Sequence, residues 1–125
     1  MTGQETRTER PDEDGRQAGC CRPIGHSLTE RDITADVQVL TALGNDTRYE
    51  ALRLVAAADD DGVCVCELEP RLGVSQGAVS QALSRLFGAG LVERRKEGRW
   101  RYYTATPRTQ RLIDVLDDTR SLDDG

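Results

Sequence analysis

The stretch from residue 63 to residue 104 constrains the fold more than any other part of the chain. Residues 63–72 predict a short strand or turn that leads into a helix, which Gly73 separates from a longer segment, residues 75–90, with helical periodicity. Residues 91–104 then have the composition of two short strands joined by a turn. Two helices across a tight glycine turn, followed by a basic hairpin, predict a winged helix-turn-helix.

The periodicity of residues 75–90 predicts a helix, and this helix would lie against DNA. Ser75 is a suitable N-cap, and Gly88 and Gly90 end the helix. Its apolar residues form one inner stripe: Val79, Ala82, Leu83 and Leu86. The outer face carries small polar side chains and one cation: Ser75, Gln76, Ser80, Gln81, Ser84 and Arg85.

The chemistry of this outer face suits DNA. Gln can pair with adenine through two hydrogen bonds, and Ser can contact bases or phosphates. We therefore expect base contacts from Gln76, Ser80 and Gln81, and a phosphate contact from Arg85. The alternative is an ordinary solvated polar face.

The predicted hairpin, residues 91–104, concentrates positive charge. We expect a two-residue turn at Glu97-Gly98. Such a turn would place like charges opposite each other, namely Lys96 with Arg99 and Arg94 with Arg101, and would pair Arg95 with Trp100. Like charges across strands destabilise a hairpin, whereas cations beside a phosphate backbone are favoured by counterion release. The pattern therefore predicts DNA contacts, with a solvated charge cluster as the alternative.

Three further helices are expected. Ser27-Leu28-Thr29-Glu30 has the form of a capping box, and the first helix should end near Leu43. A second helix, capped by Asn45 or Asp46, should end before Asp59, and Pro107 suits the first turn of a last helix. The expected apolar positions are Ile33, Val37, Leu40 and Leu43, then Tyr49, Leu52 and Val55, and finally Leu112, Ile113, Val115 and Leu116.

These elements predict one mainly α domain with a small β-hairpin over residues 27–119. Residues 1–26 are polar, charged and without helical or strand periodicity, which predicts a disordered arm. Residues 120–125 form an acidic tail. No apolar run approaches the ~18 residues of a membrane span, and the N-terminus lacks the apolar stretch of a signal peptide. We therefore expect a cytoplasmic protein with no membrane partner.

The charge is unevenly distributed. Residues 71–111 hold nine basic and two acidic residues, although the net charge of the chain is −5. A concentrated positive stretch in an otherwise acidic chain indicates a polyanionic partner such as nucleic acid.

The four cysteines form two pairs, Cys20-Cys21 in the arm and Cys64-Val65-Cys66 ahead of the predicted recognition helix. Closely spaced cysteines in the cytoplasm are more often ligands or redox groups than structural disulfides, and thiolates favour soft ions. Residues i and i+2 do not face each other in a regular helix, so Cys64 and Cys66 can share an ion only where the helix start is irregular. The alternatives are small buried residues or a redox pair, and for Cys20 and Cys21 a chance occurrence.

Taken together, these motifs resemble the ArsR/SmtB family of metal-responsive repressors. The resemblance covers roughly residues 33–106 and rests on residues 42–48 (ALGNDTR), 63–68 (VCVCEL), 73–83 (GVSQGAVSQAL) and 89–92 (AGLV). It implies a homodimer of winged-helix subunits joined through their first and last helices. It also implies binding to an inverted-repeat operator and release from it when an inducer binds.

The Cys-Val-Cys-acid-Leu string resembles the inducer site of the arsenical and cadmium/lead branches. Glu69 stands where the arsenical pattern often has a third cysteine, and the last helix lacks the His of the family's second site. As(III) or Sb(III) prefers three thiolates, so we expect Cys20 and Cys21, on the arm of the same or of the other subunit, to complete a site with Cys64 and Cys66. His26 is either an accessory ligand or a solvated loop residue.

The sequence leaves other functions open. Cd(II), Pb(II) or Zn(II) could bind all four thiolates, and a thiol redox sensor would release DNA on oxidation. An enzyme is not expected, and neither is a catalytic cofactor. The chain has no phosphate-cradling loop, no Cys-x-x-Cys and no nucleophile with a partner base.

Overall fold

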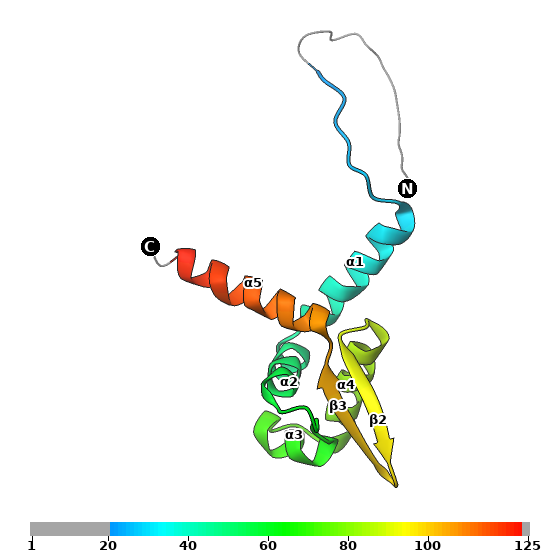
Figure 1. Ribbon diagram of the computed structural model, residues 1–125, viewed down its shortest axis with the longest axis vertical. Helices are drawn as coiled ribbons and strands as arrows, with labels where there is room; N and C mark the ends of the chain where they lie inside the picture. Colours follow the sequence, from blue (N-terminus) through cyan, green and yellow to red (C-terminus); the bar gives the residue numbers. More distant parts are fainter. Residues whose placement is uncertain (1–20, 124–125) are drawn as a thin grey trace.

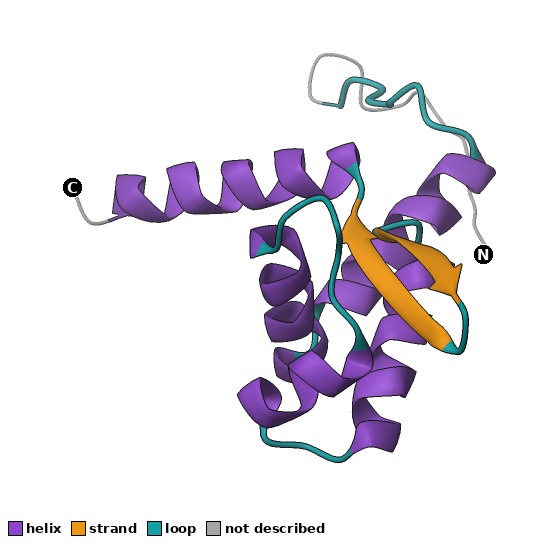
Figure 2. Cartoon of the chain, turned by 60° about the horizontal axis from the view of Figure 1, so that its bottom comes forward, coloured by secondary structure: helices purple, strands orange, loops and turns teal. Residues whose placement is uncertain are grey.

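The computed structural model describes residues 21–123. In chain order its elements are α1 (Glu30–Leu43), α2 (Asp46–Ala57), α3 (Val65–Leu72), α4 (Gln76–Gly88), β2 (Val92–Glu97), β3 (Trp100–Ala105) and α5 (Pro107–Asp123). Helices α2, α3 and α4 pack with the β2–β3 hairpin into one body, and α1 and α5 diverge from one end of it (Figures 1 and 2). The predicted winged helix-turn-helix is confirmed. None of the helices in residues 21–123 is both long and apolar enough to cross a membrane.

Local caps explain where the helices begin. The Asn45 side chain accepts a hydrogen bond from the Arg48 main-chain N–H at 2.9 Å, so Asn45 rather than Asp46 caps α2. The predicted cap at Ser75 is confirmed, since its hydroxyl accepts from the Ala78 N–H at 3.1 Å. Gly73 ends α3 in the left-handed conformation with φ of +70°, as a helix C-terminus favours.

The capping box predicted at Ser27–Glu30 is wrong by two residues. The box joins Thr29 to Asp32: the Thr29 hydroxyl accepts from the Asp32 N–H at 3.1 Å, and the Asp32 carboxylate accepts from the Thr29 N–H at 3.0 Å. The Leu28 N–H donates instead to Nδ1 of His26, which gives this donor a partner outside the helix. Helix α1 therefore begins at Glu30 and ends at Leu43 as expected.

The core lies between α2, α4 and the base of the hairpin. The predicted inner stripe of α4 is buried throughout, and Leu52 and Val55 of α2 pack against it. Tyr103 of β3 is also buried, whereas Tyr49 of α2 is only half-buried. Burying each leucine contributes about 1.5–3 kcal/mol, so this stripe fixes α4 firmly on α2.

The register of the hairpin differs from the prediction. Strand pairing places Arg94 opposite Tyr103, Arg95 opposite Tyr102, Lys96 opposite Arg101 and Glu97 opposite Trp100. The two turn residues are therefore Gly98 and Arg99, and the predicted pairs Lys96–Arg99, Arg94–Arg101 and Arg95–Trp100 are wrong. Gly98 has φ of +62°, which a glycine at the first central position of a two-residue turn readily adopts. This register also directs Tyr103 into the core, where it pairs by a single bridge with Val63.

Helices α1 and α5 place most of their apolar side chains outside this core. Only Val39 and Ala42 of α1, and Thr109 and Ile113 of α5, are buried. The exposed apolar residues of the two helices are Ile33, Val37, Leu40, Val115, Leu116 and Leu122. Helix α5 continues to Asp123, so residues 120–123 of the predicted acidic tail are helical.

Candidate functional site

The outer face of α4 is the first part of the candidate site. All six side chains predicted to face outward are exposed, and the four apolar side chains of the predicted inner stripe are buried. Ser75 has a second role, because its hydroxyl caps α4. Gln76, Ser80 and Gln81 have no side-chain hydrogen bond among residues 21–123, so their amides and hydroxyl are open to an external partner.

The cations of the hairpin fall into two groups. The Arg94 guanidinium lies over the ring of Phe87, 4.0 Å from its centroid. Arg95 donates to the main-chain oxygen of Asp61 at 3.0 Å and forms an ion pair with Glu97 at 3.1 Å. These two arginines therefore attach the hairpin to α4 and to the loop before α3.

The second group is Lys96, Arg99 and Arg101. All three are exposed, and none forms an ion pair within the described part of the chain. Lys96 and Arg101 lie directly opposite each other, and Arg99 occupies the turn. None of the like-charge pairs predicted from the sequence is present. The observed register instead places Lys96 opposite Arg101. An anion beside the hairpin tip would relieve its repulsion.

A hollow joins α4 to the beginning of α2. Its volume is about 250 Å³, and its lining includes Asn45, Thr47, Arg48, Gln81 and Arg85. The sequence had predicted Gln81 and Arg85 as DNA contacts but had not associated Thr47 or Arg48 with them. Arg48 also donates to the main-chain oxygens of Ala42 at 2.8 Å and Thr41 at 3.1 Å. No periodic or compositional signal links these positions, because the hollow forms only when α2 and α4 pack.

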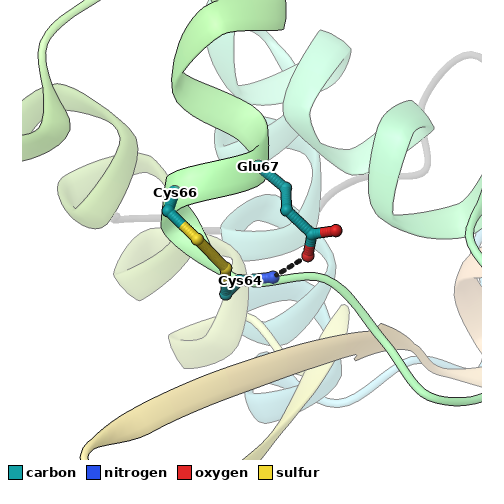
Figure 3. Close-up of a disulfide and its surroundings, with 3 residues drawn as sticks. All are labelled: Cys64, Cys66 and Glu67. Carbon is teal, nitrogen blue, oxygen red and sulfur yellow. Dashed lines mark hydrogen bonds between the residues drawn. A yellow bond between two sulfur atoms is a disulfide. The ribbon is translucent and has the colours of Figure 1, made fainter.

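Cys64 and Cys66 converge at the beginning of α3 (Figure 3). Cys64 is the N-cap, with an extended backbone at φ −104° and ψ 167°, and Cys66 is in the first turn. Because the backbone changes conformation between the two residues, the start of α3 is irregular, as was expected if Cys64 and Cys66 are to share an ion. Their Cα atoms are 5.4 Å apart and their sulfurs are joined as a disulfide. The Cys64 N–H donates to the Glu67 carboxylate at 2.9 Å, which fixes the cap residue.

Exposure differs within this thiol pair. Cys64 is buried at 6% exposure, whereas Cys66 is exposed. Any ion or reagent that reaches both sulfurs must therefore approach from the side of Cys66.

The other predicted ligands among the described residues are not assembled around this pair. Cys21 is exposed in the segment before α1, and that segment lies at the end of the molecule opposite α3 (Figure 1). Cys20 lies outside the described residues. His26 is exposed and accepts a hydrogen bond from Leu28. Residues 21–123 contain no group of three or more His, Cys, Asp or Glu side chains arranged to hold a metal ion. Within residues 21–123, Cys64 and Cys66 are therefore the only predicted thiolates that a single chain brings together.

Comparison with known proteins agrees with the winged helix-turn-helix described above. Residues 45–94 match the family described as "Bacterial regulatory protein, arsR family". The chain is 62% identical over 101 residues to a putative arsenical resistance operon repressor, ArsR2, of Halobacterium salinarum, covering 81% of this chain and 83% of that protein. It is 48% identical over 88 residues to a second putative arsenical resistance operon repressor of the same organism, covering 70% and 67%.

A similar fold occurs among solved structures. The homodimeric winged helix-turn-helix domain Mb0332 of Mycobacterium bovis, a possible ArsR-family regulator, matches with a TM-score of 0.66 at 26% identity. The match covers 75% of this chain and 88% of that one.

Proposed function

Because the chain belongs to the ArsR family of bacterial regulatory proteins, we propose that it is a homodimeric repressor released from its operator by As(III) or Sb(III). The relatives named as arsenical resistance operon repressors support a DNA-binding transcriptional repressor. The observation that carries the inducer proposal is the convergence of Cys64 and Cys66 on one point at the start of α3. Thiolates in that arrangement favour a soft ion over one that prefers carboxylates.

The proposed DNA surface combines the exposed face of α4 with the tip of the hairpin. Base contacts are assigned to Gln76, Ser80 and Gln81, whose side chains have open donors and acceptors. Phosphate contacts are assigned to Ser75, Arg85, Arg94, Lys96, Arg99 and Arg101. Arg94 is exposed like the others, but its guanidinium also lies over the ring of Phe87.

The proposed dimer interface is the exposed apolar surface of α1 and α5. Val37 is 52% exposed and Leu40 is 67% exposed in the single chain, and Val115 and Leu122 add apolar area on α5. Covering such a surface with a second copy removes it from water. The operator is then expected to be an inverted repeat whose half-sites lie about one helical turn, ~34 Å, apart.

We further propose that Cys20 and Cys21 complete the inducer site from the partner subunit's arm. Residues 21–29 of the same chain lie at the end of the molecule remote from α3 (Figure 1), which favours a ligand supplied across the dimer. Binding would then tie one subunit's arm to the other subunit's α3 and favour a dimer geometry in which the two α4 helices no longer fit neighbouring grooves. Coupling of this kind is typically about 1–3 kcal/mol, or roughly 5- to 150-fold in affinity.

Fluorescence anisotropy of an inverted-repeat duplex, under anaerobic reducing conditions, tests the proposal. As(III) should release the wild-type protein, and Cys64→Ser with Cys66→Ser should bind DNA normally but resist release. Cys20→Ser with Cys21→Ser should need more As(III). Release of the Cys64→Ser, Cys66→Ser protein at the wild-type concentration of As(III) would show the inducer site to be wrong. Parallel titrations with Cd(II), Pb(II) and Zn(II) distinguish the alternative inducers.

A thiol redox sensor is a second candidate, favoured by the disulfide between Cys64 and Cys66. Two thiols would lose two protons and two electrons to an oxidant such as hydrogen peroxide, which is reduced to water. Under anaerobic conditions with As(III) but no oxidant, a redox sensor would stay on DNA. Addition of peroxide would release it, and a thiol reductant would restore binding.

A further inference from the structure

Helix α5 is held to its own subunit mainly near its start. There the Thr109 hydroxyl donates to the main-chain oxygen of Leu91, the Gln110 amide donates to the main-chain oxygen of Ala56, and Leu112 and Ile113 pack in the core. The next hydrogen bond to the body is at Asp117, one turn further along. Beyond Asp117 the side chains up to residue 122 are exposed, and the helix projects past α2 (Figures 1 and 2). Asp117 is therefore the outermost point at which α5 is attached.

The attachment at Asp117 is a two-pronged ion pair with α2. Arg53 Nη1 lies 2.9 Å from Asp117 Oδ1, and Arg53 Nη2 lies 3.2 Å from Oδ2. The same Nη1 donates to the Tyr49 hydroxyl at 3.2 Å, and Arg120 donates to Asp117 Oδ1 at 3.0 Å. The two guanidinium groups hold the pKa of Asp117 below its ordinary value, so the pair is charged at neutral pH.

The geometry of the pair matters more than its strength. Both side chains are more than a third exposed, and exposed ion pairs add little to the free energy of folding. A planar guanidinium bound through two parallel hydrogen bonds, however, fixes the relative orientation of the two groups. The pair is therefore suited to holding an angle between α2 and α5.

Helix α2 connects this angle to the DNA surface. Leu52 and Val55, on either side of Arg53 in the sequence, pack in the same core as Leu83 and Leu86 of α4. A change in the angle between α5 and α2 would thus move α4 with the rest of the body. A tilt of about 10° displaces the end of a helix roughly 25 Å long by roughly 4 Å, more than the 3.4 Å rise per base pair.

We propose that Arg53 and Asp117 are positioning residues that set the angle between α5 and the DNA-binding body, and thereby the half-site spacing that the dimer accepts. The inference rests on the proposed function, because it requires a dimer joined through α5 and bound to an inverted repeat. It assigns to this ion pair neither an inducer contact nor a DNA contact.

The test uses duplexes selected in vitro with the full-length wild-type protein, whose half-sites are then moved apart or together one base pair at a time. Anisotropy should show a preference of roughly tenfold for one spacing in the wild type. Asp117→Asn and Arg53→Gln should each reduce that preference by roughly threefold or more. Arg53→Lys keeps the charge but cannot make the two parallel hydrogen bonds to Asp117, so it should reduce the spacing preference in part. Asp118→Asn is the matched control, because Asp118 is exposed on the same helix and outside the ion pair.

The outcomes distinguish a failure of the positioning role from a failure of the proposed function. Unchanged spacing preference in Asp117→Asn and Arg53→Gln would overturn the inference, as would an equal reduction in Asp118→Asn or full retention in Arg53→Lys. Sedimentation must show that the variants remain dimers, since loss of the dimer would place the effect in assembly and overturn the positioning role. If the wild type selects no inverted repeat at all, the proposed function itself fails.

Discussion

Ser75 shows how much one polar side chain decides at the start of α4. Its hydroxyl is the acceptor for the Ala78 N–H, one of the donors that a helix N-terminus leaves without a partner. Sequence was sufficient to identify it because an N-cap interacts only with residues two or three positions away. The misplaced box at Ser27 shows the limit of the same reasoning, since Thr29 with Asp32 offered a competing pair two residues later.

Ser75→Ala should destabilise the protein by about 1 kcal/mol, because the Ala78 N–H loses its acceptor. Urea unfolding followed by circular dichroism measures this change. Ser80→Ala, on the exposed face of the same helix, is the control and should change the free energy of unfolding by less than about 0.5 kcal/mol. Equal effects from the two substitutions would contradict the capping role.

The cations of the hairpin should differ in how they respond to salt. Arg101→Gln removes an exposed charge near the hairpin tip of each subunit, so for the proposed dimer the magnitude of the slope of log affinity against log salt should fall by about 0.9 per subunit, or about 1.8 in all. Arg94→Gln should change the slope less, because its guanidinium is engaged with Phe87. Anisotropy over a salt series provides the measurement. Equal slopes in wild type and Arg101→Gln would remove Arg101 from the phosphate contacts.

At the level of elements, α1 and α5 differ from the helices of the body. Their apolar residues have helical spacing, yet the side chains of Val37 and Leu40 remain exposed in the single chain. Periodicity identifies the apolar face of a helix but does not say whether the same chain or another copy covers it. The sequence pattern therefore predicted both helices correctly, whereas the expectation that they join two subunits came from the resemblance to the ArsR/SmtB family.

Leu40→Glu should prevent dimer formation while leaving the subunit folded, because Leu40 contributes nothing to the subunit's own core. Sedimentation equilibrium should show a monomer, and circular dichroism should show helix content close to that of the wild type. Gln38→Glu adds the same charge to an exposed position of α1 that is not three or four residues from Ile33, Val37 or Leu40, and it should stay dimeric. A dimeric Leu40→Glu protein would place the interface elsewhere.

For the molecule as a whole, pH should act on the attachment of α5. The pKa of Asp117 is lowered below 3.8 in the folded protein, chiefly by its hydrogen bond from Arg53 and also by Arg120. A lowered carboxyl pKa adds stability that is present above the unfolded value and is lost as the pH falls through the folded value. The difference in melting temperature between wild type and Asp117→Asn should therefore be constant between about pH 5 and 8, should shrink as the pH falls below about 3.8, and should vanish once the pH is below the lowered pKa of the folded protein. A difference that grew toward acid pH would have the wrong sign for this ion pair.

The candidate site could be predicted only in part. The outward face of α4 followed from its inward stripe, because both are set by the same helical period. The hairpin was expected, but its register was not, since Gly98 and the burial of Tyr103 decide it together. The roles of Phe87 and Asp61 as partners of the hairpin arginines had no sequence signal, because those contacts join different elements.

By itself, the sequence determined the helices, their caps and the division of charge, because these depend on neighbours within a few residues. The tertiary structure alone decided two things. It chose the strand register, and it paired Arg53 with Asp117 across 64 residues. Each of these depends on where separate elements come to lie, and burial of the shared core fixes that.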